Sequence, residues 1–453
     1  MRHTFVTGLA AAIVASALAT PVWAAAACRS GASFEKWLED YKREAVAEGV
    51  TRAVVDQALA GVAFDPAIVS KDRGQGVFQQ SFLQFAGRMA DGYRVQSGAA
   101  KMKQHAALLA RIEQQFGVPP QPMVAFWGLE TDFGANNGNL PVLRSLVTLA
   151  YDCRRSEMFR EELTYALKVV QRGDIAPAQM VGAWAGEIGQ TQFSPKAYFK
   201  YGVDFDGDGK RDLIRSVPDV LASSAKLLAE NGWKRGQPWL QEVRVPANLP
   251  WDQADLSIKH PRSQWATWGV KQANGAALPN DAMPASLLLP MGRLGPAFLA
   301  YENFNAFLEW NQSLVYATTA AYLATRLAGA SKVHPGNGTP VTLTAAQVAE
   351  LQRVLTRQGY DVGKADGKLG LATRAGVKQA QVKLGMPADS YPTVELIARL
   401  GGAVTAAPAA APSAPTGSVA PSVAPKQAQP KQPQQPQPKR APKQAPAPGT
   451  VQR

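Results

Sequence analysis

Amphipathic helical segments fill most of residues 29–327, and this pattern constrains the fold more than any other feature of the chain. Apolar residues recur three or four positions apart, which gives an α-helix one apolar face. Two of these segments, KQHAALLARIEQQFG and VLASSAKLLAENG, end in glycine, a residue that commonly terminates helices. Short β-rich stretches such as QEVRVPANL and SLLLPMG occur only late in the region. We therefore expect a mainly α-helical domain with a small β-containing insert.

Three further regions follow residue 328. A Gly/Pro/Ser-rich linker over residues 329–342 precedes residues 343–402, in which helical patterns flank tight turns. From residue 403 to 453 the chain consists mainly of Ala, Pro, Gln and Lys, and it holds 12 of the 33 prolines. Such a segment cannot bury a core, so we expect a disordered tail.

The net charge of +13 is unevenly distributed. Residues 403–453 carry six basic and no acidic residues, and Arg2 adds one positive charge near the N-terminus. Removing these seven charges leaves +6, a mild excess that fits an anionic polymer partner and also an ordinary basic protein. Only the tail favours nucleic-acid binding, and we expect no nucleic-acid partner.

Residues 1–24 are typical of a secretory signal peptide. Arg2 and His3 form a short charged start, residues 5–18 form an apolar run, and VWA at residues 22–24 resembles a cleavage site. No later segment has 18 uncharged apolar residues in a row. The sequence therefore predicts an exported, periplasmic protein without a transmembrane span.

The chain has only two cysteines and four histidines. This number excludes a multi-disulfide scaffold and iron–sulfur clusters, and the wide spacing argues against a Cys/His zinc site. No GxSxG motif is present to support a serine triad. In an oxidising compartment Cys28 and Cys153 favour a disulfide, whereas lipid attachment to Cys28 is the less favoured alternative. Carboxylates are left as the main catalytic candidates.

Glu130 is the best placed of these carboxylates, because it ends the nearly uncharged stretch VAFWGLETDFG. Apolar surroundings disfavour the charged form of a carboxyl group and raise its pKa, as a general acid at neutral pH requires. The alternative is a residue that caps or salt-bridges a helix end. On a helix Asp132 would point away from Glu130, so we expect it to form hydrogen bonds at the helix end.

A second cluster, over residues 182–201, combines glycines, neutral hydrogen-bonding groups and aromatic rings. This mixture suits a sugar, which has apolar faces and many hydroxyl groups, although a glycine-rich turn between core helices is the alternative. The candidate substrate-binding residues here are Trp184, Gln192 and Tyr198. Glu187 is either a second candidate acid or an exposed turn residue. Later in the chain, Tyr301 and Asn303 either cap packed helices or line a groove.

The sequence DFDGDGKRD at residues 204–212 matches the start of an EF-hand calcium loop, with Gly209 at position 6. The candidate metal ligands are Asp204, Asp206, Asp208, Lys210 through its carbonyl group, Asp212 and Asp219. Position 12 is Arg215 in place of the expected Glu, so Asp219 would have to close the site. Converging carboxylates repel one another without a cation, so we favour a structural calcium ion over a solvated turn.

Taken together, residues 124–234 resemble the lytic murein transglycosylases of the B type, glycoside hydrolase family 103. The matching pieces are GLETDFG, AGEIGQTQFSP, AYFKYGVDFDGDGKRDL and the later NGW, in the family's order. The likeness extends over residues 30–328. Two departures are Ala183, where a serine is known in the family, and one extra residue in the acidic loop before Asp219.

Residues 343–400 resemble the peptidoglycan-binding type 1 module. The matching pieces are LQRVLTRQGY, DGKLG and LATRAGVKQAQ. The chain departs from the module at Leu369 and Ala380, where aromatic residues are usual. Its second half, residues 386–400, also lacks the usual DGxxG turn.

These resemblances imply a goose-type lysozyme-like catalytic domain over residues 25–328 and a three-helix peptidoglycan-binding domain over residues 343–402. The implied reaction cleaves the β-1,4 bond between N-acetylmuramic acid and N-acetylglucosamine and forms a 1,6-anhydromuramoyl end. Glu130 would protonate the glycosidic oxygen and then accept the proton of the attacking C6 hydroxyl. The N-acetyl group of the substrate would replace the second carboxylate of ordinary glycosidases, and no cofactor is required.

The resemblance also implies roles for other residues and for partners. Gln192 matches a glutamine beside the substrate N-acetyl group, and Tyr301 and Asn303 are expected to line the groove. The implied partners are peptidoglycan glycan strands and proteins of cell-wall synthesis or division, and we expect a monomer. The alternatives are a hydrolytic muramidase on the same fold and a non-catalytic wall-binding scaffold.

Overall fold

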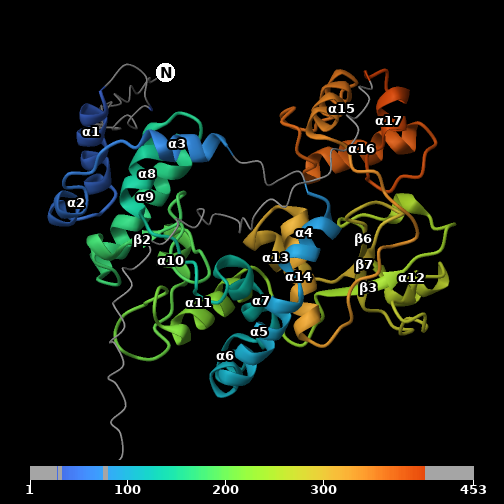
Figure 1. The fold of residues 1–453 in the computed structure, drawn as a ribbon, viewed down its shortest axis with the longest axis horizontal. Helices are drawn as coiled ribbons and strands as arrows, with labels where there is room; N and C mark the ends of the chain where they lie inside the picture. Colours follow the sequence, from blue (N-terminus) through green and yellow to red (C-terminus); the bar gives the residue numbers. More distant parts are fainter. Residues whose placement is uncertain (1–27, 29–32, 75–79, 404–453) are drawn as a thin grey trace, which may run out of the picture. The chain divides into compact units, whose positions relative to one another are not determined.

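The computed structural model describes residues 28, 33–74 and 80–403 (Figure 1). The predicted signal peptide lies outside the described residues, as does the predicted tail from residue 404 onward. Helices make up most of the described chain, and the strands are concentrated in one small sheet, so the expected fold class is confirmed. No helix of the described part is long and apolar enough to cross a membrane.

The helices before the linker fall into two groups that share one hydrophobic core. The first group packs around α8 and α9 and consists of α1 (Phe34–Ala47), α2 (Arg52–Ala58), α3 (Pro66–Arg73), α8 (Val142–Tyr151), α9 (Ser156–Arg172) and α10 (Pro195–Tyr201). The second group packs around α7 and α14 and consists of α4 (Phe82–Met89), α5 (Gly92–Gln104), α6 (Ala106–Phe116), α7 (Pro120–Thr131), α11 (Val217–Glu230), α13 (Phe304–Trp310) and α14 (Leu314–Leu327).

Helix α7 is the central helix of the second group, and all of its residues from 122 onward are buried. A helix that is apolar on every side is stable only inside a domain. It ends in a tight turn in which Asp132 and Phe133 adopt left-handed conformations, with φ of 50° and 61°. Gly128 makes room for this turn, because a Cβ atom there would lie 2.8 Å from the Phe133 ring. The turn fixes the end of the helix that carries Glu130.

The β-insert lies between α11 and α13 and contains five short strands and helix α12. Its elements are β3 (Leu240–Arg244), β4 (His260–Pro261), α12 (Arg262–Thr267), β5 (Lys271–Gln272), β6 (Pro284–Leu288) and β7 (Ala297–Ala300). The strands pair antiparallel in the order β4-β6-β7-β3-β5. Trp265 is fully buried in the insert's own hydrophobic cluster, and its Nε1 donates to the Ala285 carbonyl at 2.9 Å. The insert therefore has a core of its own.

The C-terminal module has three helices, as expected. They are α15 (Ala345–Arg357), α16 (Leu371–Lys383) and α17 (Val394–Arg399). A capping box between Thr344 and Gln347 starts α15. The buried side chain of Gln352 bonds to Asp366 and to Thr373, so it fastens the DGKLG turn to both neighbouring helices.

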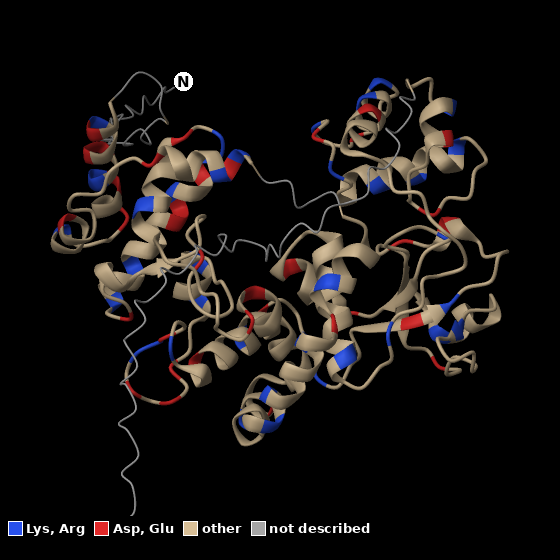
Figure 2. Ribbon diagram, in the orientation of Figure 1, with Lys and Arg blue, Asp and Glu red and all other residues tan. Residues whose placement is uncertain are grey.

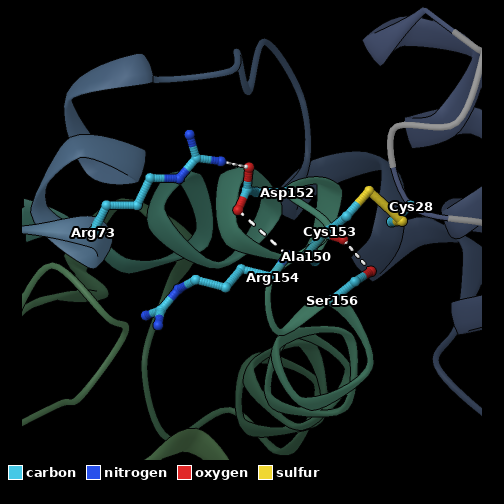
Figure 3. The surroundings of a disulfide bond; sticks show 7 residues. All are labelled: Cys28, Arg73, Ala150, Asp152, Cys153, Arg154 and Ser156. Carbon is cyan, nitrogen blue, oxygen red and sulfur yellow. Dashed lines mark hydrogen bonds and ion pairs between the residues drawn. A yellow bond between two sulfur atoms is a disulfide. The ribbon is translucent and has the colours of Figure 1, made fainter. Parts of the chain in front are cut away.

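A disulfide joins Cys28 to Cys153, in the turn between α8 and α9 (Figure 3). The same turn is held to α3 by ion pairs: Arg73 contacts Asp152 at 2.8 Å, and Arg154 contacts the buried Asp72. These bonds attach the start of the described chain to the α8–α9 pair. Elsewhere, Figure 2 shows acidic and basic residues interspersed along the described helices.

Candidate active site

Glu130 lies in the last turn of α7 and is 8% exposed. Its Oε1 accepts hydrogen bonds from Trp310 Nε1 at 3.2 Å and from the hydroxyl of Tyr316. Burial raises the pKa of Glu130 to about 7, because the charged form loses its hydration, and the two hydrogen bonds oppose this rise only in part. Near neutral pH this carboxyl group can therefore both donate and accept a proton.

Aromatic rings surround the Glu130 carboxyl group. The Trp310 ring stacks on Phe126, with centroids 3.9 Å apart, and meets the edge of Phe193 at 5.6 Å. Trp310 ends α13 and Tyr316 lies in the first turn of α14, so both partners of Glu130 come from a region about 180 residues later in the chain. The sequence did not predict that either residue contacts Glu130.

Asp132 is not a hydrogen-bonding partner of Glu130. It caps the end of α7, and its Oδ1 contacts Arg94 Nη2 at 2.7 Å. Arg94 Nε also donates to the carbonyl of Gly128 at 3.1 Å. Asp132 thus acts at the helix end, in agreement with the role expected for it.

Glu187 is the second carboxyl group of this region. The residue is partly buried, and its Oε2 atom is buried without a hydrogen-bond partner among the described residues. Burial raises its pKa, and the charge of Arg155 lowers it. Glu187 also makes a small contribution to the raised pKa of Glu130, since two nearby negative charges disfavour each other.

The glycine-rich cluster meets the end of α7 through Gln190. The Gln190 side chain accepts from Trp127 Nε1 at 2.8 Å and donates to the Ile214 carbonyl at 3.0 Å. Its main-chain carbonyl accepts from the Thr131 hydroxyl at 2.5 Å. The two sequence motifs are therefore neighbours in space, and Gln190 of the second motif bonds to Trp127 and Thr131 of the first.

Gln192 lies on the following turn, is partly buried and has a φ of 49°. Its Nε2 donates to the carbonyls of Gly189 at 2.8 Å and Asn137 at 3.3 Å, which orients the amide group. Trp184 is also partly buried and packs against the main hydrophobic core. Both side chains keep some exposed surface.

Three of the predicted substrate-binding residues instead lie inside the fold. Tyr198 is fully buried, donates to the Arg211 carbonyl, and accepts from Leu213 N at 3.2 Å. Burial raises its pKa above the ordinary value. Its hydroxyl group therefore supports the loop after α10 and does not face a groove.

The same correction applies to the two residues expected near the end of the domain. Tyr301 packs in the core of the β-insert and donates to Gln241 Oε1 at 2.6 Å. Asn303 is 0% exposed and bonds through both side-chain atoms to the main chain of Lys234 and Gln237. The polar groups of both residues are thus bonded within the fold, since a buried polar group needs internal partners.

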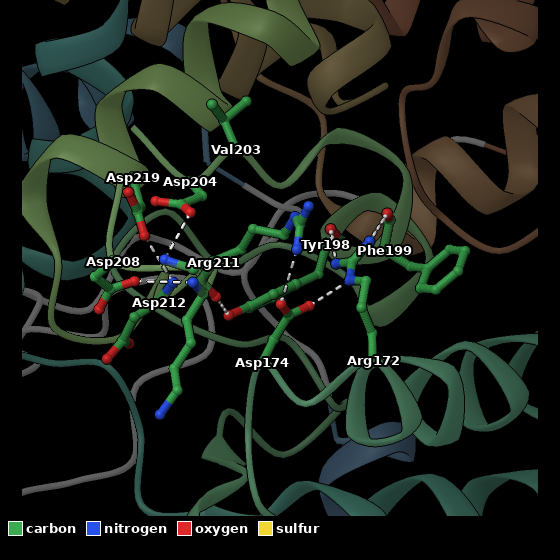
Figure 4. Close-up of polar contacts among 12 residues, drawn as sticks. Arg172, Asp174, Tyr198, Phe199, Val203, Asp204, Asp208, Arg211, Asp212 and Asp219 are labelled. Atoms are coloured by element: carbon green, nitrogen blue, oxygen red, sulfur yellow. Dashed lines mark hydrogen bonds and ion pairs between the residues drawn. The ribbon is translucent and has the colours of Figure 1, made fainter. Parts of the chain in front are cut away.

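The acidic loop after α10 brings three of its predicted ligands together. Asp204, Asp206 and Asp219 each place one carboxylate oxygen within 4.8 Å of the others. Asp208 and Asp212 instead accept hydrogen bonds from loop amides, Lys210 N at 2.8 Å and Ile214 N at 3.0 Å. Figure 4 shows the loop beside the Asp174 ion pairs, in which Arg172 Nε lies 2.5 Å and Arg211 Nη1 3.4 Å from the carboxylate.

Asp219 is the anchor of this loop and is 0% exposed. Its two oxygens accept from Phe205 N at 2.7 Å and Asp212 N at 2.8 Å. Burial raises its pKa, and these amide hydrogen bonds lower it. Carboxylate oxygens gathered in this way are the ligands that Ca²⁺ prefers.

Residues 33–325 match the family model for the transglycosylase SLT domain. Residues 344–400 match the model for a peptidoglycan binding domain. Among curated proteins, the membrane-bound lytic murein transglycosylase B of Escherichia coli (strain K12) is 31% identical over 240 residues, which cover 52% of this chain. The chain spans 64% of the length of that relative.

Solved structures of related enzymes superpose on the chain. SltB3 from Pseudomonas aeruginosa in complex with NAG-anhNAM-pentapeptide has a TM-score of 0.76 and 42% identity, covering 82% of this chain and 100% of that chain. The Escherichia coli lytic transglycosylase Slt35 in complex with calcium has a TM-score of 0.55 and 28% identity, covering 64% of this chain and 92% of that chain.

Proposed function

The chain belongs to the lytic transglycosylases that combine an SLT domain with a C-terminal peptidoglycan-binding domain, and we propose that it cleaves peptidoglycan glycan strands with Glu130 as the single acid and base. The observation that carries this proposal is the buried Glu130, which has a pKa of about 7 and no carboxylate bonded to it among the described residues. The related SltB3 was crystallised with an anhydromuramoyl compound, which supports the same product class.

The proposed reaction needs two proton transfers, one from Glu130 to the leaving oxygen and one from the attacking hydroxyl group back to Glu130. Protonated Glu130 donates to the glycosidic oxygen as the bond from this oxygen to the muramoyl C1 breaks. The carboxylate then accepts the proton of the muramoyl C6 hydroxyl, whose oxygen bonds to C1. No water is added, the 1,6-anhydro ring forms, and Glu130 regains its proton. The N-acetyl group of the substrate stabilises the positive charge at C1 between the two events.

Trp310 and Tyr316 act as positioning residues in this scheme. Both donate to Oε1 of Glu130, so Oε2 is the oxygen on which the transferred proton resides. A fixed carboxyl group needs less reorganisation at the moment of proton transfer. Gln192 and Trp184 are the partly exposed neighbours that we propose for binding the sugar.

Product analysis of wild type and Glu130→Gln on purified sacculi tests the proposal. The wild type should release anhydromuropeptides, and the variant should fold but release none. Glu157→Gln serves as the control, because it makes the same change at an exposed position at the start of α9. Anhydro products from Glu130→Gln would contradict the assignment of the acid.

A hydrolytic muramidase is the second candidate function, favoured by the buried and unbonded Oε2 of Glu187. A second carboxylate could activate water, as in ordinary glycosidases. Mass spectrometry separates the two functions, since reducing ends are one water heavier than anhydro ends. Reducing ends that disappear in Glu187→Gln would establish hydrolysis.

We propose that Asp204, Asp206 and Asp219 bind a structural calcium ion, as the relative Slt35 binds calcium. The ion would offset the repulsion among carboxylates that lie within 4.8 Å of one another. It would hold the loop and take no part in the reaction. Calorimetric titration of chelator-treated protein with Ca²⁺ tests this, with Asp206→Asn as the variant that should bind more weakly. Equal affinity in both proteins would contradict the site.

We further propose that the protein is exported to the periplasm, acts there as a monomer, and meets proteins of cell-wall synthesis or division. The predicted signal peptide and the wall-binding module support export. Fractionation of cells that carry the full-length chain tests the location. Recovery in the cytoplasm without cleavage after residue 24 would contradict it.

A further inference from the structure

The linker predicted over residues 329–342 runs against the β-insert. Asn337 Nδ2 donates to the Val245 carbonyl at 2.9 Å, and Gly338 N donates to the Leu294 carbonyl at 2.9 Å. Gly336, with a φ of 102°, lies so close to Gly295 that a Cβ atom would come within 2.2 Å of its carbonyl carbon. His334 also bonds to Glu242 at 2.9 Å. Its composition is that of a flexible linker, but its hydrogen bonds are those of a packed segment.

The module itself contacts the loop that joins β6 to β7, through α16. Arg374 is 7% exposed and donates to the main-chain carbonyls of Leu289 at 3.3 Å and Pro290 at 2.5 Å. Its guanidinium also lies over the Tyr391 ring at 5.6 Å. Burial lowers the pKa of Arg374 to about 10, so removal of the bonds would leave a buried charge without partners.

The second half of the module completes this contact where the usual DGxxG turn is missing. Asp389 accepts from Arg293 N at 3.0 Å and forms an ion pair with its guanidinium at 3.5 Å. Tyr391 is buried in the hydrophobic core of the catalytic domain, not in that of the module. Gly292 packs against it so closely that a Cβ atom would lie 2.6 Å from Tyr391 Cβ.

We propose that Arg374 and residues 389–391 form an intramolecular docking surface that holds the wall-binding module in one orientation on the β-insert. This docking explains why the usual DGxxG turn is missing, because the residues at its position in the module contact the catalytic domain instead. A third, more exposed contact, Lys378 Nζ to Asp255 Oδ2 at 3.0 Å, lies on the same face of α16. The functional consequence, which rests on the proposed function, is that a wall strand held by the module meets the Glu130 site in a fixed register.

Trypsin cleavage after Lys332 in the full chain measures docking without reference to activity. Lys332 lies in the linker, and cleavage requires the docked segment to open locally. Arg374→Gln should increase the cleavage rate at least about tenfold, as expected when roughly 1.4 kcal/mol of docking free energy is lost. Arg353→Gln, on the exposed side of the same module, should cleave as slowly as wild type. Equal rates in the two variants would overturn the proposal.

Further variants show that any effect comes from the contact and not from an unstable module. Gly292→Ala should also accelerate cleavage, because its Cβ atom meets Tyr391. Gly329→Ala also places an alanine at a positive φ, 99°, but in open space, and it should not accelerate cleavage. Lys378→Glu places two negative charges opposite each other and should accelerate cleavage. Adding Asp255→Lys to this variant restores the ion pair in reverse and should slow cleavage again. Failure of Gly292→Ala to exceed Gly329→Ala would contradict docking.

The consequence for catalysis is measured separately. Arg374→Gln should keep the wild-type rate on soluble glycan fragments and release less product from sacculi. The variant could be cleaved faster at Lys332 and still digest sacculi at the wild-type rate. That result would refute the proposal that docking holds the wall strand in a fixed register. A wild type inactive on both substrates would contradict the proposed function and leave the proteolysis result standing.

Discussion

Glu130 and Asp219 are both buried carboxylates among the described residues, and their surroundings differ. Glu130 lies among aromatic rings, and within the described part of the chain its hydrogen-bond donors are Trp310 and Tyr316. Asp219 lies beside two other carboxylates and accepts hydrogen bonds from main-chain amides. Burial raises the pKa of both groups. Burial alone therefore does not define a catalytic acid. The aromatic site suits a carboxyl group that exchanges its proton, and the amide-lined site suits a carboxylate that stays charged.

The largest expected effect is that of Glu130→Gln, which should lower the turnover of sacculi by at least about a thousandfold. It should also change the dependence of stability on pH. The folded protein binds the Glu130 proton more tightly than the unfolded chain, so this group stabilises the fold below pH 4.5, and that contribution is lost as the pH rises to about 7. Urea unfolding at about pH 4 and pH 8 should show a loss about 3 kcal/mol larger in wild type than in the variant. An equal loss of unfolding free energy in both proteins would show that folding does not raise the pKa of Glu130.

Asp219→Asn should have the next largest effect. It should lower the stability of the fold and leave the cleavage reaction unchanged. The variant keeps one carbonyl oxygen but loses an acceptor for a buried amide, at a cost of about 2 kcal/mol in the free energy of unfolding. Thermal unfolding with and without Ca²⁺ measures this, and only the wild type should gain stability from the ion. Asp208→Asn, in the exposed part of the loop, is the control. If Asp219→Asn still gained stability from Ca²⁺, the contrast between the Asp219 site and the Glu130 site would be lost.

Tyr316→Phe should shift the pH profile of activity. The Tyr316 hydroxyl stabilises charged Glu130, so its removal raises the pKa of Glu130 further. Because the acid must be protonated, the alkaline limb of the profile should move to higher pH while the maximal rate falls about tenfold. Tyr93→Phe, at an exposed position, should leave the profile unchanged. A shift to lower pH would contradict the hydrogen bond as its cause.

Glu187→Gln should have the smallest effect. Its charge is the weakest of the influences that raise the pKa of Glu130, so the alkaline limb should move to lower pH by less than about 0.5 unit. The same product analysis as above measures any reducing ends. A loss of activity comparable with that of Glu130→Gln would make Glu187 a second catalytic group and would contradict the proposal that Glu130 acts alone.

The sequence predicted the parts of the site that depend on local pattern. Glu130 was found because an uncharged stretch precedes it, and the helical class follows from periodicity. Trp310 and Tyr316 were not found, because no local pattern tells which distant helix packs on α7. Tyr198 and Asn303 were expected in a groove because polar groups beside aromatic rings suit both sugar binding and internal hydrogen bonds; burial decides between the two.

The linker shows the same limit. Its glycines and prolines were interpreted as a linker between domains, yet at Gly336 the chain closely approaches Gly295 of the β-insert. Composition indicates which backbone conformations are allowed, and only tertiary contacts determine which one is used.

The Cys28–Cys153 disulfide bears on how the protein must be made. It spans 125 residues of sequence, and in the chain-entropy model a cross-link of that length is worth about 4 to 5 kcal/mol. Protein produced in a reducing cytoplasm would lack this stabilisation, and helix α1 would be held to α8 and α9 by packing and ion pairs alone. Preparations from oxidising and reducing hosts should therefore differ in stability although their sequences are identical, and assays of the enzyme need to state which was used.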